Sequence, residues 1–300
     1  MESSEINGLY ISEQLKLLQD RICVSLETLD GQGKFKEDPW ERPGGGGGRT
    51  RIIAGQHIEK GGVNYSAVKG EMPEKILKGL GIDPCTFYAT GVSIVLHPVN
   101  PHVPIIHMNV RYFETNTGLW WFGGGIDLTP HYVDTGLASK FHNRLKSTCD
   151  AHDIDFYPKF KTWADDYFYV KHRKETRGVG GIFYDRLDNT KGNKADLLEY
   201  MMAVGNSFVP IYEEQFTANY DKSYSEREKE WQLHRRGRYV EFNLVWDRGT
   251  KFGLDTDGNI ESILMSLPPE VRWTYKYPYD KRESKTLSYL KKEIDWVGMT

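Results

Sequence analysis

An acid/base group, an amide and a guanidinium occupy alternate positions in one otherwise apolar segment. Between residues 104 and 112, His107, Asn109 and Arg111 alternate with apolar side chains. Successive side chains of a β-strand point to opposite faces, so these three groups would share one face over roughly 13 Å. Proton transfer at the histidine and carboxylate binding at the arginine are the chemistry that this face predicts. A solvated polar face of an antiparallel sheet is the alternative interpretation.

The neighbouring segments bring further polar groups toward the same face. An alternating segment before this one places Ser93 and His97 together, and the segment after it leads through three glycines, 123–125, to Asp127. Glycine allows close approach of a ligand or of another backbone. The three glycines therefore predict a flat floor beside the carboxylate, with a β-bulge as the alternative.

A second carboxylate and arginine follow one another at Asp247 and Arg248, after an alternating segment at 238–246. The planar guanidinium group donates two parallel hydrogen bonds to a carboxylate. Arg111, Arg177 and Arg248 together would suit a ligand with several carboxylates, whereas a solvated surface position is the alternative for each.

Other site chemistries have weaker support. Nine histidines suggest a metal hydrolase, but no HExxH motif is present. The five glycines at 44–48 are followed by Arg49 and Thr50 rather than by Gly-Lys-Ser/Thr, so they form no P-loop, and no GxSxG motif occurs. Three widely separated cysteines predict small buried side chains rather than a disulfide framework or a zinc site.

Composition limits the class of protein. The chain has 300 residues, 39 basic and 42 acidic side chains, and a net charge near −3, which lacks the positive field typical of nucleic-acid binding. No apolar run approaches the roughly 20 residues of a membrane span. The N-terminus resembles neither a signal peptide nor a transit peptide, so we expect a cytoplasmic protein.

The patterning predicts one α+β domain over residues 1–300, built on a large, mostly antiparallel sheet flanked by helices. We expect an N-terminal helix, a flexible glycine-rich loop at 38–48, a core at 49–278 and a C-terminal tail at 279–300. The expected helices span residues 9–30, 134–152, 161–176, 194–209 and 225–235. Asn193 would cap the fourth helix, and Pro210 would end or kink it. The expected strands span residues 51–57, 89–97, 104–114, 119–127, 182–185, 238–246 and 261–267.

Four long motifs resemble the oxygen-dependent coproporphyrinogen III oxidase family. The resemblance extends from about residue 47 to residue 275, with the motifs in the expected order. They are HPVNPHVPIIHMNVRYFE at 97–114, WWFGGGIDLTP at 120–130, KHRKETRGVGGIFYD at 171–185 and RGRYVEFNLVWDRGTKFGL at 236–254.

The resemblance implies a reaction and an assembly. Members of the family convert two propionate side chains of coproporphyrinogen III to vinyl groups by oxidative decarboxylation, which gives protoporphyrinogen IX in heme biosynthesis. The reaction consumes O₂ and releases CO₂ and H₂O₂. The resemblance also implies a homodimer, here with contacts expected in residues 239–274, and no required organic cofactor or metal. A tetrapyrrole-binding protein without catalysis and a histidine-metal hydrolase remain the alternatives.

The resemblance also implies roles for individual residues. His107 matches the proton donor, and Asp127 and Asp247 are the candidate carboxylates. The expected substrate contacts are Ser93, Asn109, Val110, Arg111, Arg177, Arg248, Asp257, Gly258 and Asn259. A divalent metal, if bound, would be held by His97, His107, His142 and His172. Asn259 stands where relatives have an arginine in a Gly-Gly-Arg-like segment, so one propionate contact is expected to differ.

Overall fold

The computed structural model describes residues 6–255 and 258–299, and within them one sheet of seven strands dominates the fold. All neighbouring strands pair antiparallel, in the order β1-β2-β3-β4-β5-β6-β9. These strands are β1 (Lys36–Glu41), β2 (Gly46–Ile53), β3 (Ile58–Glu71), β4 (Thr86–Pro98), β5 (Ile105–Thr115), β6 (Trp120–Thr129) and β9 (Gly181–Leu187).

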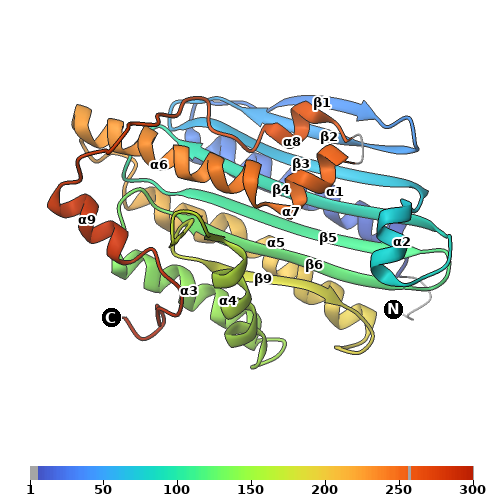
Figure 1. The fold of residues 1–300 in the computed structure, drawn as a ribbon. Coiled ribbons are helices and arrows are strands. Elements are labelled where there is room, and N and C mark those ends of the chain that lie inside the picture. The colour runs from blue at the N-terminus through green and yellow to red at the C-terminus, as the bar shows by residue number, and fades with distance from the viewer. Residues whose placement is uncertain (1–5, 256–257, 300) are drawn as a thin grey trace.

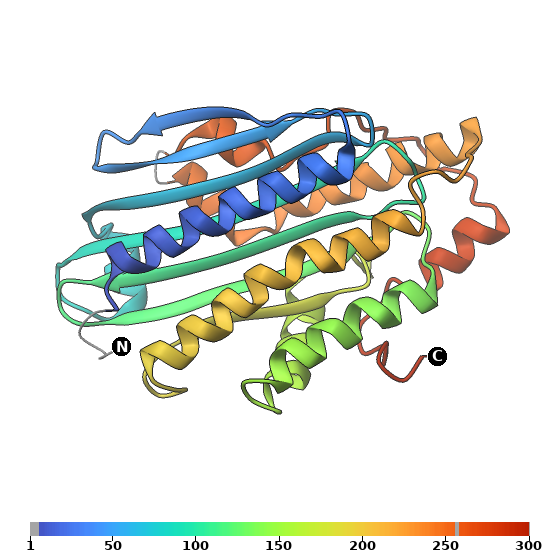
Figure 2. The same ribbon diagram turned by 180° about the vertical axis from the view of Figure 1, so that it is seen from behind.

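Three long helices form the layer behind the sheet (Figure 2). Helix α1 (Gly8–Asp30) packs on β3 and β4, α5 (Lys194–Thr217) packs on β5 and β6, and α3 (Thr135–Asp150) lies beside α5. The main hydrophobic core fills this interface. Burial of alternate apolar side chains removes their surface from water, which fixes this face of each strand toward the helices.

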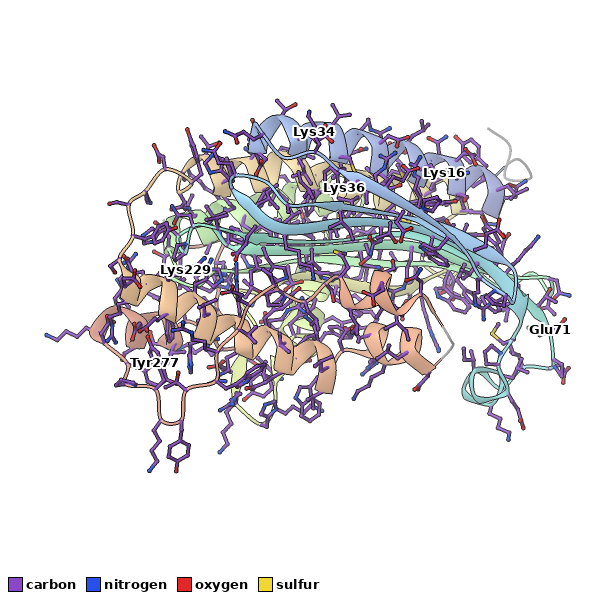
Figure 3. All side chains as sticks on the ribbon, turned by 90° about the horizontal axis from the view of Figure 1, so that it is seen from above. Lys16, Lys34, Lys36, Glu71, Lys229 and Tyr277 are labelled. Carbon is purple, nitrogen blue, oxygen red and sulfur yellow. The ribbon has the colours of Figure 1, made fainter. Side chains whose placement is uncertain are left out.

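A second layer lies in front of the sheet and is formed by α6 (Glu226–Val245), α7 (Arg248–Asp255) and α8 (Ile260–Leu264) (Figure 1). Seen from above, the sheet lies between α1, which carries Lys16, and the α6–α8 layer, beyond which the segment with Tyr277 projects (Figure 3). The second layer covers part of the front face of the sheet, whereas β5 and β6 run below α6 and α7 in the view of Figure 1.

The remaining elements flank the two layers. Helix α4 packs against β9, and a two-stranded hairpin follows α4 directly. Within the described residues, no helix is long and apolar enough to cross a bilayer. The bounds are α2 (Glu74–Leu80), α4 (Phe156–Tyr167), β7 (Tyr169–Val170), β8 (Glu175–Thr176) and α9 (Lys281–Ser288).

The α+β class, the single domain and the antiparallel central strands are confirmed. The helix expected at 194–209 begins after Asn193, whose side chain accepts a hydrogen bond from the Asp196 amide. It continues through Pro210 to Thr217, so the expected end at the proline was wrong. Phe208, Ile211 and Tyr212 are buried on both sides of the proline, and their packing compensates the missing backbone hydrogen bond.

The strand expected at 238–246 was wrong, because these residues continue α6. Ser225 and Glu228 form a capping box that starts the helix, and residues 231–240 are all buried. Charged side chains such as Arg235 and Arg238 are buried in this helix, whereas the apolar Leu244 and Val245 are exposed, so the apolar pattern does not follow the buried face of a helix. The strand expected at 261–267 was wrong as well: its first residues belong to α8, which Asn259 caps.

Several other boundaries also differed. Residues 38–48, expected as a loop, contain the end of β1 and the start of β2, joined by a turn at 42–45. Gly48 is opposite Trp40, whose ring would lie 2.3 Å from a Cβ on Gly48, so the glycines leave room for that ring. Strand β3 was missed, and the helix expected at 161–176 is α4 followed by the β7–β8 hairpin. The three cysteines are buried as expected, and none forms a disulfide.

Candidate active site

The polar face expected on β5 is present on the side of the sheet away from the main core. His107, Asn109 and Arg111 are partly buried, whereas the residues between them, Met108 and Val110, are fully buried in the core behind the sheet. The alternation predicted from the sequence is thus confirmed for this strand.

The register of the sheet brings the neighbouring polar groups into line with β5. Asn109 is opposite Ser93 on β4 and Gly125 on β6, and His107 is opposite Asp127 on β6. Adjacent strands are about 4.8 Å apart, so paired side chains on one face are in direct reach of each other.

His107, Asp127 and Arg177 form one hydrogen-bonded centre. The ring Nδ1 of His107 lies 2.8 Å from Oδ1 of Asp127. Arg177 donates to the same carboxylate through Nη2, 2.6 Å from Oδ1, and through Nε, 3.2 Å from Oδ2. The side chains of Asp127 and Arg177 are 1% and 2% exposed, whereas that of His107 is 23% exposed.

Aromatic rings enclose the guanidinium of Arg177. Its Cζ lies 4.4 Å from the ring centre of Phe168, 4.6 Å from Phe242 and 4.8 Å from Tyr239. Its Nη1 donates to Oδ1 of Asn243 at 3.1 Å. The guanidinium is therefore committed to Asp127 and Asn243, and the expectation that it binds a substrate propionate does not match this placement.

The charge of Asp127 depends on these neighbours. Burial opposes ionisation of the carboxyl, but the Arg177 guanidinium and the His107 ring hold the pKa of Asp127 below its ordinary value. An ionised Asp127 accepts the Nδ1–H of His107, which leaves Nε2 as the ring atom that can exchange a proton with a ligand. This arrangement is suited to acid/base chemistry at His107.

Arg111 has a more open environment. Its Nη2 donates to Oδ1 of Asp185 at 2.9 Å, and its Nη1 donates to Oδ1 of Asn109 at 2.9 Å. The side chains of Arg111 and Asp185 are 37% and 33% exposed. A ligand carboxylate can reach this guanidinium from solvent, as the sequence interpretation requires.

Gly123, the first of the three glycines of β6, has a role other than the expected flat floor. A Cβ on Gly123 would lie 2.7 Å from Oδ1 of Asp185 and 3.0 Å from Nε of Arg111. The register between β6 and β9 also shifts between Phe122 and Gly124, which is the bulge given as the alternative. At Gly123, therefore, glycine makes room for the protein's own ion pair.

Asp247 and Arg248 lie at the junction of α6 and α7 rather than at the end of a strand. Asp247 Oδ1 accepts from the Tyr167 hydroxyl at 2.8 Å, and Oδ2 accepts from the Thr250 amide at 2.6 Å. Arg248 is exposed, with its Cζ 5.9 Å from the ring centre of Tyr167. The two residues emerge together as expected, but at a junction between two helices.

The remaining expected substrate contacts are dispersed. Val110 is fully buried behind the sheet, so its side chain is separated from the front face. Asn259 accepts a hydrogen bond from the Ser262 amide at 3.0 Å, and the amide of Gly258 donates to the Gly253 carbonyl. Asp257 lies outside the described residues.

The four histidines named as metal ligands do not form a site. His142 bonds Tyr157 and the Val179 carbonyl through its two ring nitrogens. The two ring nitrogens of His172 are hydrogen-bonded to Glu241 and Trp246. His97 contacts the Ser266 carbonyl, and His107 contacts Asp127. Across residues 6–255 and 258–299, no group of three or more His, Cys, Asp or Glu side chains could hold a metal ion.

Two hollows lie away from this centre. One, of about 250 Å³, is lined by residues that include Tyr132, Gln215 and Arg282. The other, of about 500 Å³, is lined by residues that include Lys69 and Phe87. Neither lining includes His107, Asp127 or Arg177. The candidate active site is therefore identified by its hydrogen bonds and charges and not by the size of a cavity.

Sequence interpretation missed three partners in the site. Asp185 lies at an alternate position from Gly181 in β9, so the strand period could have placed it beside Arg111. Asn243 lies within the segment expected as a strand at 238–246, and the helix instead turns it toward Arg177. Tyr167, the partner of Asp247, is the last residue of α4 and carries no local signal for this contact.

The fold and the site define a single-domain α+β protein with a buried acid/base centre and a separate anion-accessible arginine on one sheet face. The chain belongs to the coproporphyrinogen III oxidase family, whose model matches residues 10–296. An oxygen-dependent coproporphyrinogen-III oxidase of Prochlorococcus marinus (strain NATL1A) is 48% identical, with 93% of this chain and 88% of that protein covered. The enzyme of the same description from Parasynechococcus marenigrum (strain WH8102) is 47% identical, with coverage of 94% and 85%.

Proposed function

We propose that this chain catalyses the oxygen-dependent oxidative decarboxylation of coproporphyrinogen III to protoporphyrinogen IX, a step of heme biosynthesis. Two propionate side chains become vinyl groups. For each, one propionate carboxylate, one O₂ and one proton give one vinyl group, one CO₂ and one H₂O₂. O₂ accepts the two electrons released by the substrate, and the proposal includes no organic cofactor.

The observation that carries this proposal is the His107–Asp127–Arg177 centre beside the open Arg111 on one sheet face. Each decarboxylation takes up one proton, so the site needs a group that exchanges protons near the reacting propionate. We assign this exchange to Nε2 of His107. Asp127 orients the ring and stabilises its protonated form, and Arg177 keeps Asp127 ionised.

Anion recognition is assigned to groups that are open to the ligand. Arg111 would bind one propionate, with Ser93 and Asn109 beside it on the same face, and the exposed Arg248 would bind another. The Asp247 carboxylate is the candidate acceptor for pyrrole N–H groups. Val110, Gly258 and Asn259 would contribute backbone groups or, at Asn259, an amide in place of the relatives' arginine.

A metal site does not fit the proposed mechanism, because the four histidines are held in separate hydrogen-bonded positions. No step is assigned to a metal ion. The acid/base and electrostatic roles above are carried by side chains of the chain itself.

We also propose that the active form is a homodimer in which residues 239–274 supply contacts. This segment carries exposed apolar side chains that a partner would cover, and they are Leu244, Val245, Leu254, Ile260 and Trp273. Sedimentation equilibrium, with Leu244→Asp as the disrupting variant, tests the assembly. The cytoplasm is the proposed compartment, and fractionation of the producing cells tests it.

The function is tested by incubating the purified protein with coproporphyrinogen III in air, under argon, and in air with EDTA. Vinyl product is followed by chromatography and fluorescence. We expect product in air, with or without EDTA, and none under argon. Product formation under argon, or its loss with EDTA, would contradict the proposal, and the second result would favour a metal-dependent reaction.

Two substitutions separate catalysis from binding. His107→Ala should reduce turnover by about 10²- to 10⁴-fold while porphyrin still quenches the intrinsic fluorescence. Asp247→Asn should likewise retain porphyrin binding and lose most turnover, and full activity of that variant would remove Asp247 from the mechanism. Tight binding by the unmodified chain without any product would favour the alternative of a tetrapyrrole-binding protein.

A further inference from the structure

The carboxylate of Glu241, on α6, collects hydrogen bonds from several side chains at a place that the proposed mechanism does not use. Arg173 donates to it through Nε and Nη2, at 2.7 and 2.6 Å. Arg238 Nη1 and Trp273 Nε1 donate at 2.7 and 2.9 Å. His172 contributes Nε2 at 2.8 Å, since its Nδ1 accepts from the Trp246 indole. The Glu241 side chain is only 12% exposed.

The donors His172 and Arg173 lie in the turn that joins β7 to β8. Lys174, the next residue of this turn, has a φ of 56°, a left-handed conformation that is unfavourable for a residue other than glycine. The turn's own backbone hydrogen bonds, from Arg173 and Lys174 to the Val170 carbonyl, support this shape, and contacts from outside the turn add to them. Glu241 provides a bidentate, charge-assisted contact to its tip, which is among the stronger kinds of hydrogen bonding.

The same hairpin leads directly to the acid/base centre. Strand β8 ends at Thr176, and the next residue is Arg177. Helix α6 therefore holds the hairpin at its tip through Glu241 and at its base through Asn243, which accepts from Arg177. Tyr239 and Phe242 of the same helix stack on the guanidinium.

We propose that Glu241 is a positioning residue for the reaction: by fixing the β7–β8 turn on α6, it sets the Arg177 guanidinium on Asp127 and so orients His107. The inference rests on the proposed function, because it gives Glu241 a role only through the His107–Asp127 pair. Glu241 does not itself contact His107 or Asp127 through any hydrogen bond described above.

The consequence of releasing the turn follows from the groups around Asp127. His107 faces it from β5, Arg177 from the residue after β8, and Tyr239 from α6, while Asp247 acts on Arg177. Burial favours the neutral carboxyl, and Arg177 is the principal group that opposes this effect. A less firmly held Arg177 would allow Asp127 to take up a proton at higher pH, and His107 would lose its anionic partner.

The test compares Glu241→Gln with Glu59→Gln. Glu59 is the matched control, because it accepts from Arg236 of the same helix at 2.5 Å but does not touch the hairpin. For Glu241→Gln we expect kcat to fall about 10- to 100-fold, as for a small misplacement of catalytic groups. KM should stay within about twofold, and the acid limb of the kcat profile should move to higher pH. Glu59→Gln should leave the acid limb unchanged.

A second measurement is independent of turnover. The ¹³C signal of the Asp127 carboxyl, assigned with Asp127→Asn, should titrate at higher pH in Glu241→Gln than in the unmodified chain. If the unmodified chain forms no product but this titration still moves, the proposed function fails, while the effect of Glu241 on the Arg177–Asp127 pair is upheld.

An unchanged Asp127 titration and an unchanged acid limb in a folded Glu241→Gln would overturn the inference and leave Glu241 a purely structural role. If Glu241→Gln does not fold, Arg173→Lys keeps the charge but removes the bidentate contact. It should shift the same two readouts in the same direction by a smaller amount, and no shift in that variant would equally overturn the inference.

Discussion

Two aspartate–arginine pairs lie on the same face of the sheet and differ mainly in their contact with water. The side chains of Asp127 and Arg177 are 1% and 2% exposed, whereas those of Asp185 and Arg111 are 33% and 37% exposed. Each arginine also bonds an asparagine amide oxygen. The chemistry of the two pairs is alike, so their environments decide what each can do.

The buried pair, Asp127 and Arg177, has a structural role. Aromatic rings exclude water from the Arg177 guanidinium, so neither charge can be removed without leaving the other unpaired in a medium of low dielectric constant. The open pair remains accessible to solvent, and exposed ion pairs contribute only about 0–1 kcal/mol. A ligand carboxylate can therefore replace Asp185 on Arg111 at little cost, whereas Asp127 is held permanently by Arg177.

The largest effect is expected for Asp127→Asn. The amide keeps the shape of the side chain but leaves the Arg177 charge buried and unpaired, so the free energy of unfolding should fall by about 3–5 kcal/mol. Turnover should fall by about 10²-fold or more, because His107 loses the partner that orients its ring. Urea unfolding and product formation measure the two effects.

Asp185→Asn is the matched control, since it makes the same chemical change in the open pair. Its free energy of unfolding should change by less than about 1 kcal/mol. Equal losses of stability in the two variants would show that exposure does not separate the pairs.

A smaller effect is expected for Arg111→Lys, which keeps the charge and removes the planar fork. If Arg111 binds a propionate, KM should rise about tenfold or more, because hydrogen bonds to charged groups are worth roughly 1.5–3 kcal/mol. The value of kcat should change much less, since the acid/base centre is intact. Steady-state kinetics measure both, and a loss confined to kcat would place Arg111 in the chemical step instead.

The parts of the site that were predictable are those governed by strand period and close pairing. His107, Asn109 and Arg111 could be placed on one face because β5 has a buried apolar side that fixes its register. Asp127 followed from the next strand of the same meander. In each case the spacing along the strand determines to which face the side chain points, so the sequence alone is sufficient to place these residues on one face.

Contacts between distant segments could not be predicted in this way. The partner of Arg177 depends on α6, in which charged side chains are buried and Leu244 and Val245 are exposed, so its apolar residues alternate as in a strand. The same error placed Asp247 at the end of a strand rather than at a junction of helices. Glycines 123–125 indicated a close approach correctly, but their sequence could not show that Arg111 and Asp185 make it.

The smallest effect concerns the pH dependence of stability, which should differ between the pairs. The pKa of Asp127 is lower in the folded chain than its unfolded value near 3.9, so the unfolded chain binds more protons as the pH falls. The stabilising contribution of Asp127 is therefore complete above about pH 5 and is lost as the pH falls through the folded-state pKa, with a slope of at most about 1.4 kcal/mol per pH unit.

Urea unfolding at pH 3–7 measures this effect. The free energy of unfolding should differ between the unmodified chain and Asp127→Asn by a constant amount above pH 5, and by a smaller amount below pH 4. For Asp185→Asn the difference should stay below about 1 kcal/mol throughout. An Asp127→Asn difference that persists unchanged to pH 3 at measurable stability would mean that Asp127 has the same pKa in the folded and unfolded chain, and so would contradict a carboxylate stabilised by Arg177. A difference that disappears above pH 5 would equally contradict an ionised Asp127 held by Arg177.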